Sequence, residues 1–384
     1  MLPIINDQDY SGTMSFSKLT NWKLQLPIIL LVVATLIGSV VCLSNRYNGE
    51  KWRIELFEAQ YLVKYVHSRI LTPTYSEKVV DSEFSSFFMP RAGVGLSSNK
   101  PRESVIEQEL SRRVAEALDR LDLSIINIPF LDIFPPVSVE LATPPKYVVI
   151  SPRTRIEHID GYLVKQDLTP KQIDAIEETI EISGEKSAYA VKISGIATYP
   201  ALIDNNLSYQ RTVFAVAHEW IHHYLAFFNL GRIYFSGGTA MNETVADIAA
   251  LEITKMVLKH HPPSNKINEL VEGRPFDLTL LQDLRRDVDT LLLSHEVVAA
   301  EELMSAKRLA WCEAFTWCPR KINQAYLAWV DQYSARDGSK NIVGQQLKNI
   351  RLSTGSLQNF LIVVREIDSH ERLTVIQQEL ADSR

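Results

Sequence analysis

The stretch AVAHEWIHHYL at residues 215–225 constrains the fold of this chain more than any other part of its sequence. His218, Glu219 and His222 form the pattern H-E-x-x-H, which on an α-helix sets the two imidazoles one turn apart on the same face. Two imidazoles in that arrangement suit a zinc ion. Glu219 lies about 100° further round the helix, where it can take a proton from a water molecule in an open coordination position. The pattern therefore predicts a zinc-binding helix.

The neighbours of this motif leave almost no polar face, so we expect the helix to be buried. They are Val213, Phe214, Val216, Ala217, Trp220, Ile221, Tyr224, Leu225 and Phe227. Burying two imidazoles and a carboxylate without partners is costly, which requires a metal ion or a full hydrogen-bond network. A catalytic zinc takes three protein ligands and keeps one position open. A third ligand must therefore come from outside the helix.

The third ligand is expected downstream of the motif. Leu225 and Phe228 stand where a metzincin would have glycine and histidine, so that arrangement is excluded. Instead, NETVAD at residues 242–247 opens a second apolar helix, on which Glu243 and Asp247 share a face. One of these carboxylates can bind zinc, and the other can hold a ligand histidine by its second ring nitrogen.

These motifs resemble those of the gluzincin metallopeptidases, the family of thermolysin. H-E-x-x-H is followed about twenty residues later by N-E-x-x-x-D, and GRIYFSGGTAMNE at 231–243 is similar to the segment that carries a catalytic tyrosine in that family. The resemblance covers about residues 195–257. It implies zinc ligands at His218, His222 and Glu243, a general base at Glu219, an oxyanion donor at Tyr234, and outer partners of the ligands at Asp247 and Asn242.

A second donor to the transition state has no clear counterpart in this sequence. Thermolysin-like enzymes use a late histidine for this purpose, and the candidates here are His295, Tyr326 and His370. His295 is expected in a turn between two helices, where a solvated histidine is the simpler interpretation. Tyr326 is either a core tyrosine with a satisfied hydroxyl or an active-site donor.

Composition and charge narrow the class of protein. The chain has 384 residues, 46% of them apolar, and a mean hydropathy near zero, which is enough to build the core of one or two domains. Its net charge of −6 and its pI of about 5.9 show no excess of positive charge of the kind that binds nucleic acid. We therefore expect no nucleic-acid partner, and the resemblance to metallopeptidases implies a peptide or protein substrate.

The N-terminal region predicts a membrane anchor. A polar tail at 1–23 precedes a span at 24–43, whose 18 residues from 26 to 43 carry no charge and reach about 27 Å as a helix. A cleaved signal peptide is disfavoured, because the stretch lacks the small-residue cleavage site that such peptides have. A lipoprotein anchored at Cys42 is disfavoured too, because Val41 stands where a small residue would be needed. The flanking charges hardly favour either orientation, and we lean toward an extracytoplasmic catalytic domain.

The remaining chain divides into a juxtamembrane region and a catalytic domain. Residues 44–100 are expected to contain a helix at 51–71 and a linker at 81–101. The domain at 101–384 is predicted to be α+β, with an α+β part at 101–205 and a helical part at 206–384. Expected helices lie at 103–121, 171–182, 208–229, 241–259, 277–293, 297–314 and 322–333, and expected strands at 137–141, 147–150, 156–164 and 188–202.

Two features of this layout stay open at the level of sequence. Residues 195–199 are either an edge strand that a peptide substrate could join or a buried central strand. Cys312 and Cys318 can be bridged only if the chain turns between them, because a continuous helix would point them to nearly opposite sides. Three cysteines do not by themselves make a disulfide framework.

The sequence as a whole predicts a membrane-anchored, zinc-dependent metallopeptidase with its zinc site between two helices. One alternative is a membrane-tethered zinc-binding scaffold or inactive homologue. Glu219 argues against it, because a structural zinc site needs no general base and is usually closed by a fourth protein ligand. Another alternative is a zinc hydrolase of non-peptide amides.

Overall fold

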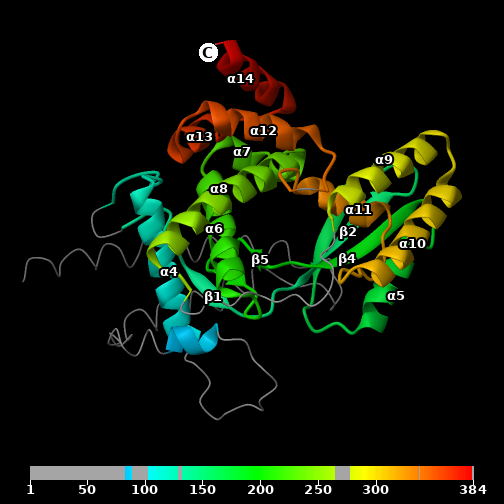
Figure 1. Cartoon of the computed structure of the whole chain (residues 1–384), viewed down its shortest axis with the longest axis horizontal. Coiled ribbons are helices and arrows are strands. Elements are labelled where there is room, and N and C mark those ends of the chain that lie inside the picture. The colour runs from blue at the N-terminus through cyan, green and yellow to red at the C-terminus, as the bar shows by residue number, and fades with distance from the viewer. Residues whose placement is uncertain (1–82, 89–102, 129–131, 264–276, 337, 383–384) are drawn as a thin grey trace, which may run out of the picture.

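The protein has the α+β fold that the sequence predicts, with two small sheets and a mainly helical C-terminal part (Figure 1). The computed structural model describes residues 83–88, 103–128, 132–263, 277–336 and 338–382. The predicted tail at 1–23, membrane span at 24–43 and helix at 51–71 all lie outside the described residues. Within the described ranges, no helix combines the length and apolar character needed to cross a bilayer.

Residues 83–88, expected in a linker, belong instead to the folded domain. They form a short helix whose Phe84 and Phe88 rings lie 5.3 and 5.2 Å from the ring of Tyr209, measured between centroids. The guanidinium of Arg113 lies 3.9 Å from the centroid of Phe84. Burial of these aromatic rings outweighs the loop-like composition of the surrounding sequence.

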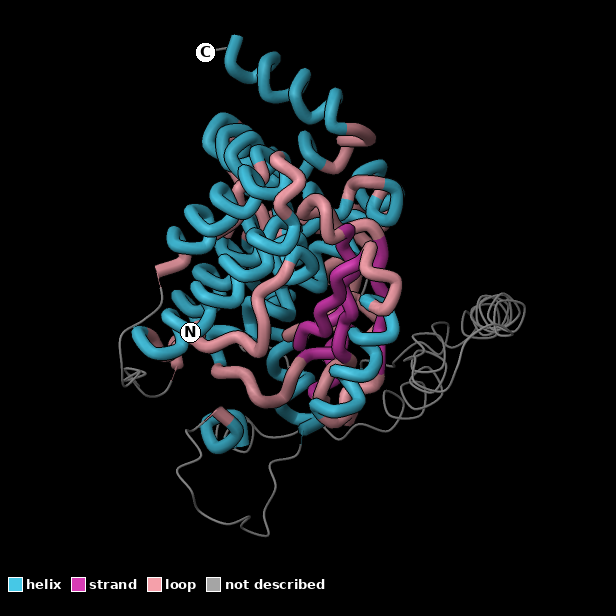
Figure 2. The backbone as a smooth tube through the Cα atoms, turned by 90° about the vertical axis from the view of Figure 1, so that its right-hand side faces the viewer, coloured by secondary structure: helices cyan, strands magenta, loops and turns pink. Residues whose placement is uncertain are grey.

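Among the described residues, six strands form two three-stranded sheets, which lie at one flank of the helices (Figure 2). The first sheet has the order β1-β6-β5, with β1 and β6 parallel and β5 antiparallel to β6. The second sheet has the order β3-β2-β4 and is antiparallel throughout. The strands are β1 (Val139–Leu141), β2 (Lys146–Pro152), β3 (Asp160–Val164), β4 (Lys186–Lys192), β5 (Gly195–Ile196) and β6 (Ala201–Ile203).

The middle strand of the second sheet is covered on both faces. Val148 and Ile150 of β2 pack with Ile173 of helix α5 (Pro170–Glu181), whereas Val149 packs with Ala325 from the opposite side. This double burial explains why the sequence of β2 is a continuous apolar run rather than an alternating one.

The single strand expected at 188–202 is three strands in the structure. Because β5 and β6 pair antiparallel, with Ile196 opposite Leu202, the chain has to reverse direction between them. Pro200 lies in that reversal and has no N–H to offer to a ladder. The strand expected at 156–164 is also shorter, since β3 begins at Asp160.

The helices at 103–120 and 209–225 pack on the first sheet, and helices supply most of the main core. In Figure 1, α12, α13 and α14 lie above α8, while α9, α10 and α11 lie beside the second sheet. The two predicted zinc-binding helices are α6 and α8, and α6 ends four residues earlier than the 229 expected. The helices are α4 (Glu103–Arg120), α6 (Tyr209–Leu225), α7 (Asn229–Arg232), α8 (Thr239–His260), α9 (Thr279–Leu293), α10 (Val297–Ala314), α11 (Gln324–Gln332), α12 (Ile342–Ser353), α13 (Leu357–Val364) and α14 (His370–Asp382).

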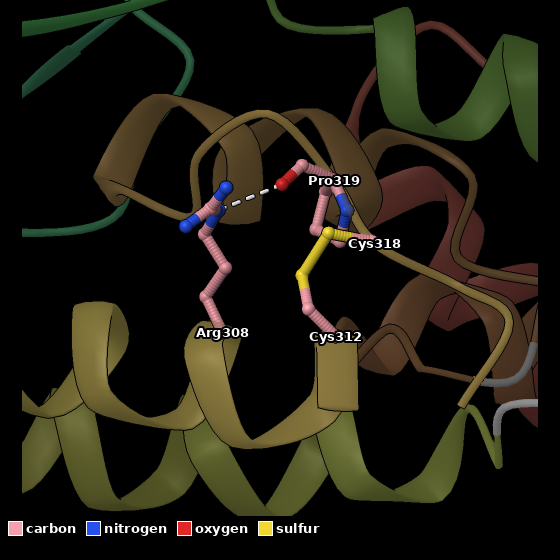
Figure 3. The surroundings of a disulfide bond; sticks show 4 residues. All are labelled: Arg308, Cys312, Cys318 and Pro319. Atoms are coloured by element: carbon pink, nitrogen blue, oxygen red, sulfur yellow. Dashed lines mark hydrogen bonds between the residues drawn. A yellow bond between two sulfur atoms is a disulfide. The ribbon is translucent and has the colours of Figure 1, made fainter. Parts of the chain in front are cut away.

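Helices α9 and α10 form the expected hairpin, with His295 at a φ of 61° in the turn between them. Helix α10 ends at Ala314, so the chain turns and brings Cys318 back to Cys312, to which it is bridged (Figure 3). Nε of Arg308 donates a hydrogen bond to the carbonyl oxygen of Pro319 at 2.7 Å, which stabilises the turn that brings Cys318 back to Cys312. The two cysteines can be bridged because the helix ends between them and the chain turns there.

Candidate metal centre

Three side chains from α6 and α8 converge on one point. Nε2 of His218 lies 3.1 Å from Nε2 of His222 and 3.1 Å from Oε2 of Glu243, and Nε2 of His222 lies 3.6 Å from Oε1 of Glu243. His218 and Glu243 are buried, and His222 is partly buried. This group could hold a metal ion, because its three potential ligand atoms all lie within 4.8 Å of one another.

The orientation of the His222 ring is set by Asn242. Nδ2 of Asn242 donates to the carbonyl oxygen of Leu230 at 3.2 Å, so its Oδ1 is the atom that faces Nδ1 of His222 at 2.7 Å. An amide oxygen only accepts, so Nδ1 of His222 carries the proton and donates it. Nε2 therefore presents a lone pair toward Glu243, as a metal ligand requires.

The His218 ring has a carboxylate at the corresponding position. Its Nδ1 lies 3.1 Å from Oδ1 of Asp247, which is 5% exposed as a side chain. Asp247 in turn accepts hydrogen bonds from Nε and Nη2 of Arg336, at 2.6 and 2.8 Å. A carboxylate at Nδ1 favours the proton on that nitrogen, which leaves the lone pair of Nε2 for a cation.

The electrostatics of this cluster favour a bound positive charge. Burial lowers the pKa of His218, but the carboxylates of Asp247 and Glu243 outweigh it and raise that pKa to about 10. Burial raises the pKa of Glu243, but the imidazoles of His222 and His218 hold it well below its usual value. Two ring lone pairs and a carboxylate oxygen facing one point need a proton or a metal ion between them.

Glu219 lies one residue from the first histidine and is 6% exposed. Burial is the main cause that raises the pKa of its carboxyl group, although His218 and His222 oppose it. Its carboxylate lies against the backbone of β5, where a Cβ added to Gly195 would be only 2.6 Å from Oε1. The glycine thus allows strand β5 and the carboxylate to approach each other closely.

Tyr234 belongs to the same cluster. It lies in the 3-10 helix η2 (Tyr234–Ser236), and Gly237, with a φ of 102°, lets the chain turn sharply from there into α8. The Tyr234 hydroxyl donates a hydrogen bond to Oε1 of Glu243 at 2.5 Å. Burial and the charge of Glu243 raise the pKa of this phenol well above its usual value, so it remains a donor.

The cluster opens into a cleft of about 1260 Å³. His218, Glu219, His222 and Glu243 line this cleft together with residues 195–197 of the β5 edge. The lining also includes the aromatic residues Tyr147, His158, Trp329 and Tyr333. The Tyr147 hydroxyl and Nε2 of His158 lie 3.1 Å apart, and the rings of Trp329 and Tyr333 are 5.0 Å apart between centroids.

The structure does not bring the three candidate second donors to this cleft. His295 and His370 are exposed, and Tyr326 packs on Tyr189 with ring centroids 5.2 Å apart. Tyr333 lies there instead, with its ring centroid 6.3 Å from that of His218. Burial and the nearby carboxylates raise the pKa of Tyr333 well above its usual value.

Two residues of this site were missed by the sequence analysis. Tyr333 and Arg336 follow α11, far from the motifs in sequence, and no spacing rule connects them to His218 or Asp247. The one signal was the polar end of an otherwise apolar helix at 322–333. Tyr326, the candidate donor from that helix, does not line the cleft and packs on Tyr189.

His223, the residue after the motif, also has a defined partner. Its Nε2 donates a hydrogen bond to the carbonyl oxygen of Thr198 at 2.9 Å, and burial lowers its pKa to about 4. The neutral ring therefore fixes the segment that follows β5. His223 also lines the cleft described above, but it is not one of the converging potential ligands.

Comparisons of this chain with protein-family models, with curated proteins and with solved structures found no match. The geometry of the site itself is therefore the basis for assigning a function. It combines a His218–His222–Glu243 cluster that could hold a metal ion with a buried carboxylate, Glu219, and an open cleft.

Proposed function

We propose that this protein is a zinc-dependent metallopeptidase of the gluzincin type. The observation that carries the proposal is the convergence of His218, His222 and Glu243 at the floor of a cleft that Glu219 also lines. A metal held there would face the cleft directly. A buried carboxylate beside it is the arrangement that general-base hydrolysis needs.

The ligand set supports zinc as the metal. Two atoms bound to one tetrahedral zinc at about 2.0–2.1 Å lie about 3.3 Å apart, close to the 3.1 and 3.6 Å separations of this cluster. Charge balance supports a divalent ion. With both imidazoles neutral, as metal ligation requires, the buried carboxylates of Glu219, Glu243 and Asp247 and the guanidinium of Arg336 leave two negative charges to be neutralised.

The open side of the cluster favours an enzyme over a scaffold. Among the described residues the cluster offers three ligands, and all three line the cleft. A structural zinc site is usually closed by a fourth protein ligand. A purely structural zinc site would also give no reason for burying the carboxylate of Glu219, which costs free energy.

The residues around the cleft supply the steps of amide hydrolysis. Zinc, when bound, would polarise a substrate carbonyl and make a water molecule more acidic. Glu219 takes a proton from the attacking water as the new C–O bond forms, and delivers it to the leaving nitrogen as the C–N bond breaks. The phenols of Tyr234 and Tyr333, both protonated, can donate hydrogen bonds to the negative oxygen that develops.

The cleft is suited to a peptide rather than a small amide. Its volume of about 1260 Å³ exceeds the roughly 300–1,000 Å³ of ordinary small-molecule sites. Among the described strands, β5 pairs with β6 alone, and residues 195–197 line the cleft. An extended peptide could add to this edge through backbone hydrogen bonds, which bind many sequences with little demand on side chains.

The proposal includes the side of the membrane on which the catalytic domain lies. The Cys312–Cys318 bridge is typical of proteins in oxidising compartments. It supports an extracytoplasmic catalytic domain tethered by the predicted membrane span at 24–43. Alkylation of the unfolded protein without reductant should then modify one of its three cysteines, and alkylation after reduction all three.

The test is Glu219→Gln in the full-length protein, purified in detergent. This change keeps the size of the side chain but removes its basicity, so zinc content should stay at the level of the parent. Cleavage of a denatured protein mixture, read by mass spectrometry, should fall at least about 100-fold. Glu252→Gln on α8, outside the cleft, is the matched control, and a chelator should abolish cleavage by the parent.

Equal cleavage by the parent and by Glu219→Gln would refute the general-base role. A parent that binds zinc but cleaves no peptide, while hydrolysing small amides through Glu219, would favour the zinc hydrolase of non-peptide amides. Zinc without any hydrolysis would favour the scaffold.

A further inference from the structure

The turn that follows α11 is anchored directly on α8, the helix that carries Glu243. The backbone N–H of Arg336 donates to the carbonyl oxygen of Tyr333 at 2.9 Å, which closes the turn. The hydroxyls of Ser334 and Thr244 lie 2.5 Å apart and share a hydrogen bond. This connection leads from α11, beside the second sheet, to α12, above α8 (Figure 1).

The next helix holds the same turn from the other side. A Cβ added to Gly344 of α12 would lie 1.8 Å from the carbonyl oxygen of Ser334, so only a glycine allows this close approach. The turn at 333–336 is therefore fixed between α8 and α12. Its side chains have defined positions relative to the candidate metal centre.

Arg336 uses its planar group in two ways at once. Its guanidinium donates two parallel hydrogen bonds to the carboxylate of Asp247, at 2.6 and 2.8 Å. The Cζ atom of the same group lies over the Tyr333 ring, 4.0 Å from its centroid. Asp247 lies 3.1 Å from Nδ1 of His218, and Tyr333 lines the cleft. Arg336 thus contacts one partner of a candidate ligand and one wall of the cleft.

We propose that Arg336 is a positioning residue, which holds Asp247 against the ligand His218 and the Tyr333 ring at the cleft wall. The inference rests on the proposed metal centre. A buried carboxylate with a single partner can rotate away from the imidazole, whereas the fork of Arg336 fixes both of its oxygens. The same guanidinium lies over the ring of Tyr333, a cation–π contact that favours the observed position of the ring.

Lysine cannot replace this residue. An ammonium keeps the charge but donates from a single point, so it cannot hold both oxygens of Asp247 and stack flat on Tyr333. We expect Arg336→Lys to weaken zinc binding about 10- to 100-fold, the range seen when the outer partners of metal ligands are changed. A role in stability alone would lower the melting temperature without this loss of affinity.

Arg351→Lys is a matched control within the same protein. Arg351 of α12 donates the same fork to Glu252 of α8, with Nε and Nη2 at 2.6 and 2.8 Å from its oxygens. Neither of these residues lines the cleft. The two variants therefore remove equivalent hydrogen bonds from the same helix, and only one of them is next to the proposed centre.

The experiment measures the zinc affinity of the full-length, metal-free protein by competition with a chromophoric chelator. Thermal melting of each metal-free variant checks that it folds. We expect weaker binding in Arg336→Lys and parent affinity in Arg351→Lys. If both variants bind zinc like the parent, the inference is wrong while the proposed metal centre stands. A parent without zinc affinity would overturn both.

A double-mutant cycle with Asp247→Asn gives a second measurement if Arg336→Lys is unstable. If Arg336 acts through Asp247, a change at 336 should cost little further zinc affinity in the Asp247→Asn background. Arg336→Gln can replace the lysine variant in this cycle. Fully additive losses would show that Arg336 affects the metal by another route and would refute the inference.

Discussion

At the scale of single residues, the candidate site depends on close contacts between side chains and backbone. Gly195 is the clearest case, because a methyl group there would meet Oε1 of Glu219 at 2.6 Å. We expect Gly195→Ala to push the Glu219 carboxylate aside and to reduce turnover about 10- to 100-fold, since small misplacements of catalytic groups have effects of that size. Zinc content should not change.

Steady-state kinetics and metal analysis together test this expectation. Ser194→Ala is the control, since this exposed neighbour contributes only its backbone oxygen to the strand, as an acceptor for the N–H of Asp204. Parent turnover in Gly195→Ala would mean that β5 or Glu219 can shift without consequence, and would weaken the general-base assignment.

Tyr333 is the residue whose role depends most on the structure. Removing its hydroxyl in Tyr333→Phe should lower kcat about 10- to 100-fold with little change in KM, because a donor to developing charge acts in the transition state. Tyr326→Phe provides the control, since Tyr326 is also largely buried but does not line the cleft. Equal kcat values for the two variants would show that the Tyr333 hydroxyl is not a donor to the transition state and that the ring only packs.

The local motifs were predictable from the sequence, whereas Tyr333 and Arg336 were not. His218 and His222 are one helical turn apart, so their shared face follows from helix geometry alone. Glu243 and Asp247 lie four residues apart and follow the same rule. Tyr333 and Arg336 meet them through the packing of distant elements, and a single sequence carries no periodic signal for such contacts.

At the scale of elements, the second sheet is attached to the helical part by a buried ion-pair cluster. Glu177 of α5 is 2% exposed and pairs with Arg320 and with Nζ of Lys321, at 2.8 Å in the latter case. It also accepts a hydrogen bond from the N–H of Ala190 in β4 at 2.7 Å. These contacts join α5, β4 and the segment that leads into α11.

The charge of Glu177 should make this junction sensitive to acid. Burial raises the pKa of Glu177, but Arg320 and Lys321 outweigh it and leave the pKa below its usual value. Because the folded pKa is the lower one, the stabilisation is present above the unfolded value of about 4.3 and is lost as pH falls through the folded value. Glu177→Gln should cost about 2–3 kcal/mol at pH 7 and progressively less below pH of about 4.

Urea unfolding of the parent and of Glu177→Gln, at pH 7 and at a pH below about 4, measures the cost of the substitution in free energy of unfolding. Glu178→Gln, a change at the exposed neighbour on the same helix, controls for the loss of one negative charge. A cost for Glu177→Gln that is the same at pH 7 and in acid would show that the ion pairs do not stabilise the junction.

Prediction of elements succeeded where periodicity is strong. Helices such as α4, α5, α9 and α10 fall within a few residues of their expected bounds, because each has an apolar stripe and recognisable ends. The stretch at 188–202 was read as one strand because apolar residues run through it. Its division into β4, β5 and β6 depends on which partners each piece pairs with, and pairing is a long-range property.

At the scale of the whole molecule, the cleft lies where sheet and helices meet. One wall comes from α6, α8 and the edge of β5, and the other from β2, β3 and α11. The α+β class was predictable from the order of elements. The closure of the two walls around the metal centre was not, since it depends on the turn at 333–336 and its contacts with α8 and α12.

The candidate metal centre should therefore also stabilise the assembled molecule. Glu243 and Asp247 of α8 and Glu219 of α6 are buried within one cluster, where protons on the imidazoles have to balance the carboxylates when no ion is bound. We expect a chelator to lower the melting temperature of the full-length protein and added zinc to restore it. A hundredfold excess of zinc over its Kd stabilises the folded state by about 2.7 kcal/mol.

Two variants distinguish this effect from nonspecific binding of zinc. Glu243→Ala removes a ligand, so its melting temperature should respond little to zinc or chelator. Glu219→Gln keeps all three ligands, and its melting temperature should still rise with zinc although its activity is lost. A parent whose melting temperature is the same with chelator and with zinc would contradict the metal centre itself. A response in the parent and in Glu219→Gln, but not in Glu243→Ala, would place the ion at Glu243 of α8, because Glu243 is the one proposed ligand in which these proteins differ.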